Sequence, residues 1–363
     1  MAHPDIQDRH QAQRGRGATF NPANRYEATA TEVYDDGWGI DPLEDQPSPA
    51  TVVTTEAART IVSVNNSPDI GFNQSINPYR GCEHGCVYCY ARPTHAYLGM
   101  SPGLDFETRI VAKPGAADLL RKKLRGRNYV PQTIAIGANT DAYQPVEREQ
   151  RVTRGIIEVL AEHKHPFAII TKNQLVLRDL DLLGPLAADN ICRVMVSITT
   201  LDPRLSRVME PRASHPEARL RTVEQLSSAG VSVGVMVAPL IPAINDHELE
   251  RILEAVAARG AQAAGYVALR LPLELKELFE GWLQTHFPDR KDRVLDLVRQ
   301  MRGGRLYDAQ FGQRQRGTGT YAQLLQARFK AALARHELDR PLPLLSAAHF
   351  RVPPQPGEQL GLF

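Results

Sequence analysis

Short apolar runs alternate with amphipathic stretches through the middle of the chain. The apolar runs are rich in Val, Ile and Ala, which is typical of buried strands. The stretches between them carry apolar residues at a helical spacing, so we expect helices there. The predicted strands are Ser75–Tyr79, Gln132–Gly137, Phe167–Thr171, Cys192–Thr199, Val231–Pro239 and Ala264–Leu271. The predicted helices lie near Ala116–Leu124, Val146–His163, Val176–Ala188, Pro216–Ala229 and Asp246–Arg259.

This alternation predicts an α/β fold with a parallel sheet. Six strand–helix units are too few for a closed eight-stranded barrel. Residues 1–65 are polar with weak periodicity, and we expect a largely irregular leader that wraps the core. We assign the core to residues 66–275, a helical basic extension to 276–338 and a Pro-rich tail to 339–363.

Composition favours a globular protein with an uneven charge distribution. The chain has 363 residues, 42% of them hydrophobic, and a formal net charge of +2. Residues 1–50 carry nine acidic and four basic side chains, whereas residues 301–340 carry eight basic and three acidic ones. The late basic segment indicates either an anionic partner or a solvated helix face. The longest apolar run, Val231–Ile241, is too short to cross a membrane and the start lacks a signal peptide, so we expect a cytoplasmic location.

Three cysteines within eight residues form the most specific motif of the chain. Cys82, Cys86 and Cys89 have the spacing C-x3-C-x2-C, whereas structural zinc sites and ordinary iron–sulfur sites use four protein ligands. Three thiolates on one loop leave one iron of a [4Fe–4S] cluster open to a substrate. Zinc is the alternative, with His84 or His95 as a fourth ligand.

The cysteine motif, together with the aromatic Tyr88 before the third cysteine, resembles the signature of the radical SAM superfamily. The sequences Asn-Pro-Tyr-Arg-Gly-Cys at 77–82 and Cys-Tyr-Ala-Arg at 89–92 are similar to the branch around spore photoproduct lyase, which is described as DNA repair photolyase-like. The resemblance covers about residues 74–275. It implies a partial (β/α)6 TIM-like barrel of the radical SAM type.

The resemblance also implies two cofactors and a mechanism. Cys82, Cys86 and Cys89 would hold the [4Fe–4S] cluster, and S-adenosyl-L-methionine (SAM) would chelate the open iron. One electron, from a donor such as flavodoxin or ferredoxin, would break a sulfur–carbon bond of SAM. The products would be methionine and a 5′-deoxyadenosyl radical that abstracts a hydrogen atom from the substrate, while the protein orients the reactants.

The carboxyl ends of the predicted strands carry the candidate SAM ligands, because reactive groups of parallel β/α folds gather there. The second strand is followed by Asn139, Thr140 and Asp141. These residues could accept hydrogen bonds from the amino group of SAM. Alternatively, they cap the next helix, which favours Asp or Thr at its start.

Further candidates follow the next three strands. Lys172 could pair with the SAM carboxylate, and Ser197 could meet the ribose. The backbone at Ala238 could lie against adenine. The resemblance implies that Tyr88, Lys172 and Ser197 lie around SAM.

One departure from the related branch concerns the hydrogen-atom donor. Spore photoproduct lyases end their second strand with a cysteine that donates a hydrogen atom to the product radical, and the matching position here is Ala138. The resemblance therefore supports radical chemistry but not thymine-dimer splitting by the same relay. Tyr97 or Tyr143 could supply the hydrogen atom instead.

Two features near the C-terminus point to partners. Gln359, Leu360, Leu362 and Phe363 resemble the pentapeptide by which bacterial polymerases and repair proteins dock on the replication sliding clamp, unless they fold back onto the core. In the basic segment, the loop Gly312–Gly317 could contact a nucleic acid backbone. The basic residues of this segment are Arg302, Arg305, Arg314, Arg316, Arg328, Lys330 and Arg335.

We therefore expect a radical SAM enzyme, of the lyase or oxidoreductase type, that acts on DNA or a nucleotide in repair or modification. One alternative is a radical SAM enzyme that acts on a protein, a tRNA or a small metabolite. Another is a non-catalytic iron–sulfur protein that is recruited through its tail.

Overall fold

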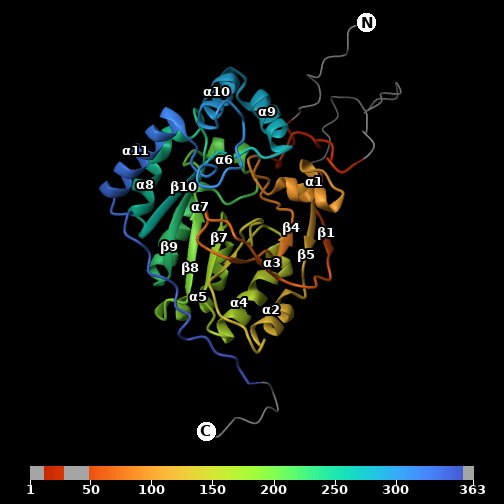
Figure 1. Ribbon diagram of the computed structural model, residues 1–363, viewed down its shortest axis with the longest axis vertical. Helices are drawn as coiled ribbons and strands as arrows, with labels where there is room; N and C mark the ends of the chain where they lie inside the picture. Colours follow the sequence, from red (N-terminus) through yellow and green to blue (C-terminus); the bar gives the residue numbers. More distant parts are fainter. Residues whose placement is uncertain (1–11, 28–48, 355–363) are drawn as a thin grey trace.

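A twisted sheet with one open side forms the centre of the computed structural model, which describes residues 12–27 and 49–354 (Figure 1). Six neighbouring strands, from β10 to β3 in the order given below, pair in parallel, and β2 pairs antiparallel with β3 at the edge. Within the described ranges no pairing joins the two edges, so the barrel is open, as predicted. In spatial order the strands are β10 (Ala263–Ala268), β9 (Ser232–Leu240), β8 (Cys192–Ser197), β7 (Phe167–Thr171), β6 (Ile134–Ile136), β3 (Gln74–Ile76) and β2 (Val62–Val64).

Helices connect the consecutive parallel strands and bury their apolar faces against the sheet (Figure 1). Helices are expected between these strands, because two neighbouring parallel strands can be joined only by a crossover connection. The prediction of an α/β fold with a partial barrel is therefore confirmed. The helices that bury apolar residues against the sheet are α2 (Ala116–Leu124), α4 (Val152–Glu162), α5 (Leu180–Ala188), α7 (Pro216–Ser228) and α8 (Leu249–Ala257), and the short polar helix α3 (Glu147–Gln150) precedes α4.

A second, three-stranded sheet lies beside the first and was not predicted. It has the order β1 (Val52–Thr55), β5 (Arg109–Ala112), β4 (Tyr79–Arg80). The predicted strand Ser75–Tyr79 is thus divided between two sheets. Pro78 explains the division, because proline has no N–H to donate to a sheet ladder.

The predicted helix Val146–His163 is also divided, at Arg151, whose backbone is left-handed with φ 51°. The carboxylate of Glu147 accepts the N–H groups of Thr153 at 2.9 Å and Arg154 at 3.3 Å. Glu147 therefore caps the start of α4 from the preceding turn. Capping of this kind satisfies N–H groups that have no partner inside the helix.

A second apolar core forms beyond the carboxyl ends of the parallel strands. The helices α9 (Leu275–His286) and α10 (Lys291–Met301) pack there against α6 (Pro203–Met209) and against the loop that carries the three cysteines. Figure 1 shows α9 and α10 together at the top of the view. These helices cover the end of the barrel where chemistry is expected, and α11 (Gly319–Arg335) packs beside α8 and α10.

The leader and the tail lie against opposite ends of the barrel. Residues 12–27 have no regular structure, and several of their side chains are buried near the short helix α1 (Leu104–Thr108). Tail residues bond to the amino ends of two strands: the N–H of Ser346 donates to Asn190 and that of Arg351 to His163, both at 2.9 Å. In the described part of the chain no helix is long and apolar enough to span a bilayer.

Candidate active site

The cysteine loop, residues 81–91, follows β3 and β4 and lies at the carboxyl ends of the parallel strands. The N–H of Cys82 donates to the carbonyl of Phe106 at 2.8 Å, which ties the start of the loop to α1. The N–H of Val87 donates to Met209 at 3.0 Å, which ties its middle to α6. The loop is therefore held in place by two elements that are distant in the sequence.

The three thiols of this loop are reduced and largely removed from water. Cys82 and Cys86 are buried, Cys89 is half-buried, and none of them forms a disulfide. Burial raises the pKa of each thiol, to about 12 for Cys86, because a thiolate is poorly solvated there. Nearby groups oppose this effect: the N–H of Asp141 on Cys82, two loop N–H groups on Cys89, and the Lys172 ammonium on Cys86 and Cys89.

This donor set fits an iron–sulfur cluster better than a zinc ion. Zinc needs four donors that converge on one point. Among the residues that the structure describes, no three or more His, Cys, Asp or Glu side chains converge in this way. His84 uses its ring nitrogens on Asp141 at 3.3 Å and Asn173 at 3.2 Å, and His95 packs edge-on against Phe106. Neighbouring thiols fit a cluster, in which each thiolate binds a different iron and coordination removes the thiol proton.

A buried ion pair lies against the cysteine loop and holds it in place. Arg92 and Glu107 are both fully buried and form a salt bridge. Arg92 also donates to the carbonyl of Cys86 at 2.8 Å and to that of Gly103 at 2.8 Å. A buried charge of this kind is tolerated only when it is paired and hydrogen-bonded. The pair therefore determines where the middle of the loop sits.

The leader closes over the same loop. The carboxylate of Glu107 accepts the N–H groups of Gly17 at 3.0 Å and Ala18 at 2.8 Å. A Cβ atom added to Gly17 would lie 1.7 Å from the carbonyl oxygen of Gly85, so only glycine allows this close approach. Gly17 and Ala18 thus contact the support of the candidate cluster site.

A polar network lies on the inner side of Tyr88. The Tyr88 hydroxyl donates to the carboxylate of Glu210, which also accepts from Thr199 at 2.7 Å and pairs with Arg219. Glu210 and Arg219 are both buried, and Arg219 also donates to the carbonyl of Ser197 at 3.2 Å. The structure shows a buried pair beside the cysteine loop.

Lys172 connects several of the predicted SAM ligands. Its ammonium lies 5.7 Å from the centre of the Tyr88 ring and 3.4 Å from the carbonyl oxygen of Ala238. Among the described residues, the ammonium forms no salt bridge with a carboxylate. Ser197 is buried at the end of β8, two residues before Thr199 in the Glu210 network. Tyr88, Lys172 and Ala238 are therefore close together, with a cation available for an anionic ligand.

The three predicted SAM ligands after β6 differ in their burial and in their hydrogen bonds. Asp141 accepts from the Thr171 hydroxyl at 2.7 Å and from the N–H of Lys172 at 2.7 Å, in addition to His84. The Thr140 hydroxyl donates to the carbonyl of Tyr79 at 3.0 Å, whereas Asn139 is exposed. Asp141 therefore positions Lys172 and the cysteine loop, and Asn139 is the member of this trio whose side chain faces solvent.

The two predicted hydrogen-atom donors lie in different surroundings. Tyr143 is fully buried and its hydroxyl donates to Asp179 at 2.9 Å. Tyr97 is 68% exposed and packs against Tyr26. Sequence reasoning did not single out Tyr90, which follows Cys89 directly, is 45% exposed and donates its hydroxyl to the carbonyl of Ala138. Its position next to the third cysteine of the motif is the sequence feature that could have identified it as a site residue.

Part of the basic segment is engaged by other groups of the protein. Arg302 is buried and donates to the carbonyls of Leu269 and Arg314 at 2.8 and 2.9 Å. Arg328 pairs with Glu250. The exposed members are Arg305, Arg316, Lys330 and Arg335. The clamp-like residues Gln359, Leu360, Leu362 and Phe363 lie outside the described residues.

Comparison with known proteins agrees with this geometry. The family model described as Radical SAM superfamily matches residues 76–256. Protein Rv2578c of Mycobacterium tuberculosis H37Rv is 36% identical over 285 residues, which cover 77% of this chain and 80% of the relative. Protein MJ0683 of Methanocaldococcus jannaschii is 28% identical over 186 residues, covering 51% of this chain and 67% of that one.

Solved structures of spore photoproduct lyase share the fold. The structure in complex with dinucleoside spore photoproduct has a TM-score of 0.55 and 16% identity, covering 78% of this chain and 79% of that one. A mutant with bound AdoMet and dinucleoside spore photoproduct has a TM-score of 0.54 and 16% identity. The three-cysteine loop at the carboxyl end of a partial parallel barrel, the family match and the similar relatives lead to one conclusion: this chain belongs to the radical SAM superfamily.

Proposed function

We propose that this protein is a radical SAM enzyme that acts on nucleic acid. The observation that carries the assignment to SAM chemistry is the group of free thiols, buried at Cys82 and Cys86 and half-buried at Cys89, beside the ammonium of Lys172. When bound, a [4Fe–4S] cluster would supply one electron to SAM, giving methionine and a 5′-deoxyadenosyl radical. The enzyme type, lyase or oxidoreductase, depends on whether the radical leads to bond cleavage or to a net oxidation.

The chain's own residues would orient SAM and exclude water from it. Lys172 would pair with the SAM carboxylate, since its ammonium already lies above Tyr88 and near Ala238. Asn139, with Thr140 and Asp141 behind it, would meet the amino group. Ser197 would face the ribose. Burial of Tyr88 and Glu210 leaves a water-poor wall next to the thiols, which suits a reactive intermediate that side reactions would destroy.

A nucleic acid substrate is supported by the solved relatives and by the surface chemistry. Spore photoproduct lyase has been solved with a dinucleoside photoproduct. The present chain shares that fold and carries exposed arginine side chains in its C-terminal extension. A protein, a tRNA or a small metabolite is the alternative substrate. Tyr97 and Tyr143 remain the proposed hydrogen-atom donors, in place of a cysteine at Ala138.

Anaerobic reconstitution with iron and sulfide tests the cofactor assignment. We expect iron and sulfide to bind, and dithionite plus SAM to yield 5′-deoxyadenosine. Cys86→Ala should lose both properties. Cys192→Ala is the matched control, because Cys192 is equally buried but lies at the amino end of β8. SAM cleavage that survives Cys86→Ala would refute the assignment, and a bound cluster without 5′-deoxyadenosine would favour the non-catalytic iron–sulfur protein.

Deuterium-labelled SAM tests the substrate. The reconstituted protein is incubated with dithionite and ultraviolet-damaged DNA, and the nucleotides are analysed by mass spectrometry. Exchange of deuterium between the 5′ carbon and the DNA would support a nucleic acid substrate. Exchange confined to added tRNA, protein or metabolites would support the alternative.

We also propose two partners and a location. Residues 339–354 lie at the end of the barrel opposite the cysteine loop. The sequence at Gln359, Leu360, Leu362 and Phe363 supports a clamp-binding role for the C-terminal residues. Deleting the last five residues should abolish co-purification with a bacterial sliding clamp and leave the iron content unchanged. Flavodoxin or ferredoxin would donate the electron, in the cytoplasm, where thiols stay reduced.

A further inference from the structure

An arginine-rich edge borders the candidate cluster site at the end of β10. Arg270 follows this strand by two residues, and its guanidinium lies 5.2 Å from the centre of the Tyr90 ring. Tyr90 in turn follows Cys89 directly. Because the carboxyl ends of parallel strands form the reactive edge of such folds, Arg270 stands where a substrate would approach the cluster.

A loop of the C-terminal extension adds two more arginines to the same edge. The N–H of Ala268 donates to the carbonyl of Gln315 at 2.8 Å, so the loop continues the sheet edge. The buried Arg302 secures it by donating to the carbonyls of Gln313 at 3.1 Å and Arg314 at 2.9 Å. This arrangement brings Arg314 and Arg316 beside the end of β10, although they are distant from Arg270 in the sequence.

Each of these three guanidinium groups lies against an aromatic ring. Arg270 lies on Tyr90, Arg316 lies 5.2 Å from the centre of the Tyr266 ring, and Arg314 lies 4.4 Å from that of Phe311. Tyr90 and Phe311 are 45% and 55% exposed, so both offer a ring face or edge to solvent. We call Arg270, Arg314, Arg316, Tyr90 and Phe311 the arginine edge.

The positive charge of the arginine edge is incompletely neutralised. Asp69 forms an ion pair with Arg314. The pKa of Asp69 is lowered by the hydrogen bond from the Gly312 N–H and by the positive charges of Arg314 and Arg270. Within the described part of the chain, Arg270 and Arg316 form no ion pair. The Nε of Arg270 is buried and has no hydrogen-bond acceptor there.

We propose that the arginine edge is the substrate-binding surface, that it binds phosphodiester groups through Arg270 and Arg316, and that Tyr90 and Phe311 stack on unpaired bases. This rests on the proposed function and assigns it a substrate surface. Guanidinium groups pair well with phosphate oxygens, and exposed aromatic rings beside them are typical of proteins that bind single strands. An acidic peptide would match the charges but would not need the exposed rings.

Binding measurements test this surface without turnover. Fluorescence anisotropy is recorded with a labelled single-stranded DNA of about 16 nucleotides, a typical upper site size for one binding fold. The protein is anaerobically reconstituted, and salt is varied. For single strands, each phosphate contact contributes about −0.7 to the slope of log K against log salt concentration. The double variant Arg270→Gln/Arg316→Gln should therefore reduce the slope by about 1.4 and weaken binding by tenfold or more at moderate salt.

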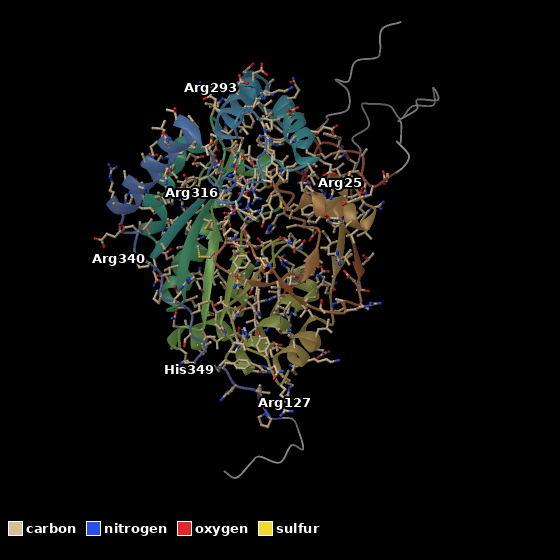
Figure 2. All side chains as sticks on the ribbon, viewed as in Figure 1. Arg25, Arg127, Arg293, Arg316, Arg340 and His349 are labelled. Carbon is tan, nitrogen blue, oxygen red and sulfur yellow. The ribbon has the colours of Figure 1, made fainter. Side chains whose placement is uncertain are left out.

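Arg127→Gln provides the matched control. Arg127 is exposed, and Figure 2 shows it at the bottom of the view, far from Arg316 beside β10. The substitution Arg127→Gln removes one charge and should leave the salt slope and the affinity near those of the unaltered protein. Tyr90→Leu and Phe311→Leu should weaken binding without changing the salt slope, because they remove stacking and no charge. Iron content and melting temperature establish that each variant is folded.

The outcomes separate this proposal from the broader one. SAM cleavage by a protein that does not bind the oligonucleotide would overturn the arginine edge and leave the radical SAM assignment intact. A loss with Arg127→Gln of about half that of the double variant, in proportion to the one charge that it removes, would also overturn it, because the binding would then be a property of total charge. If inorganic phosphate or a mononucleotide competes as strongly per site as the oligonucleotide, the source of the phosphate is a small metabolite and the nucleic acid proposal is wrong.

Discussion

Replacing Glu107 with Gln should detach the cysteine loop from the support beneath it. The side chains of Glu107 and Arg92 are both 0% exposed, and the substitution leaves the Arg92 charge without its carboxylate. Removing one partner of a buried ion pair costs about 3–5 kcal/mol. Arg92 keeps three carbonyl acceptors in Cys86, Pro102 and Gly103, so we expect the lower end, about 3 kcal/mol.

Thermal unfolding converts this loss into a measurable shift. Globular proteins unfold with an entropy of roughly 2 cal/mol/K per residue, so for 363 residues a loss of about 3 kcal/mol lowers Tm by about 4 °C. Glu162→Gln is the control, because Glu162 makes an exposed pair with Arg121 at 3.3 Å. An exposed pair contributes about 0–1 kcal/mol, so its Tm should change by about 1 °C or less.

Iron content supplies a second measurement that reports on the loop itself. Glu107 also accepts the N–H groups of Gly17 and Ala18, so its replacement loosens both the leader and the cysteine loop. We expect the reconstituted Glu107→Gln protein to bind less iron and to lose it faster to a chelator. If the two variants have the same Tm and the same iron content, the buried pair does not hold the loop and the reasoning is refuted.

Three further predictions concern the leader, the SAM site and pH. Gly17→Ala should destabilise the protein by about 3 kcal/mol, because its Cβ would meet the Gly85 carbonyl at 1.7 Å, whereas Gly71→Ala, which meets nothing within 4 Å, should be neutral in the same melt. Lys172→Met should raise the KM for SAM at least tenfold with iron content unchanged, and an unaltered KM would exclude it as the carboxylate ligand. Burial lowers the pKa of His165 to about 4, so protonation of the unfolded chain below about pH 6.5 should lower stability as the pH falls, by about 1 kcal/mol between pH 7.5 and 5.5. Urea unfolding of His165→Gln at both pH values should show a smaller difference, and an equal difference would contradict this assignment.

Several elements agree with the sequence pattern because local rules decide them. The strand Phe167–Thr171 and the helix Ala116–Leu124 have the predicted bounds. Their apolar periodicity, turn residues and helix formers all favour the same structure. Two predicted elements are divided in the structure, the strand Ser75–Tyr79 at Pro78 and the helix Val146–His163 at Arg151. A proline ends the first and the side-chain cap from Glu147 starts a new helix in the second, although the apolar periodicity continues through both.

The second sheet could not be predicted in the same way. β1 lies in the polar leader, and its four residues are exposed; its pairing with β5 joins segments more than fifty residues apart. Such pairings depend on which chain segments meet, and periodicity contains no information on this. The same holds for the basic segment, where Arg302 and Arg328 are engaged inside the protein and Arg270, outside that segment, is without an ion-pair partner within the described ranges.

The sequence alone determined the donor chemistry and the α/β fold class. Three cysteines in eight residues are brought together by covalent spacing, whatever the rest of the chain does, and the alternation of strands and helices places their loop at the reactive edge. The tertiary structure alone decided which distant groups surround the thiols: Gly17 against Gly85, Glu210 against Tyr88, and Arg270 against Tyr90. The physical reason is that a buried charge or a close backbone approach is stable only with its particular partner, and that partner is chosen by packing across the whole fold.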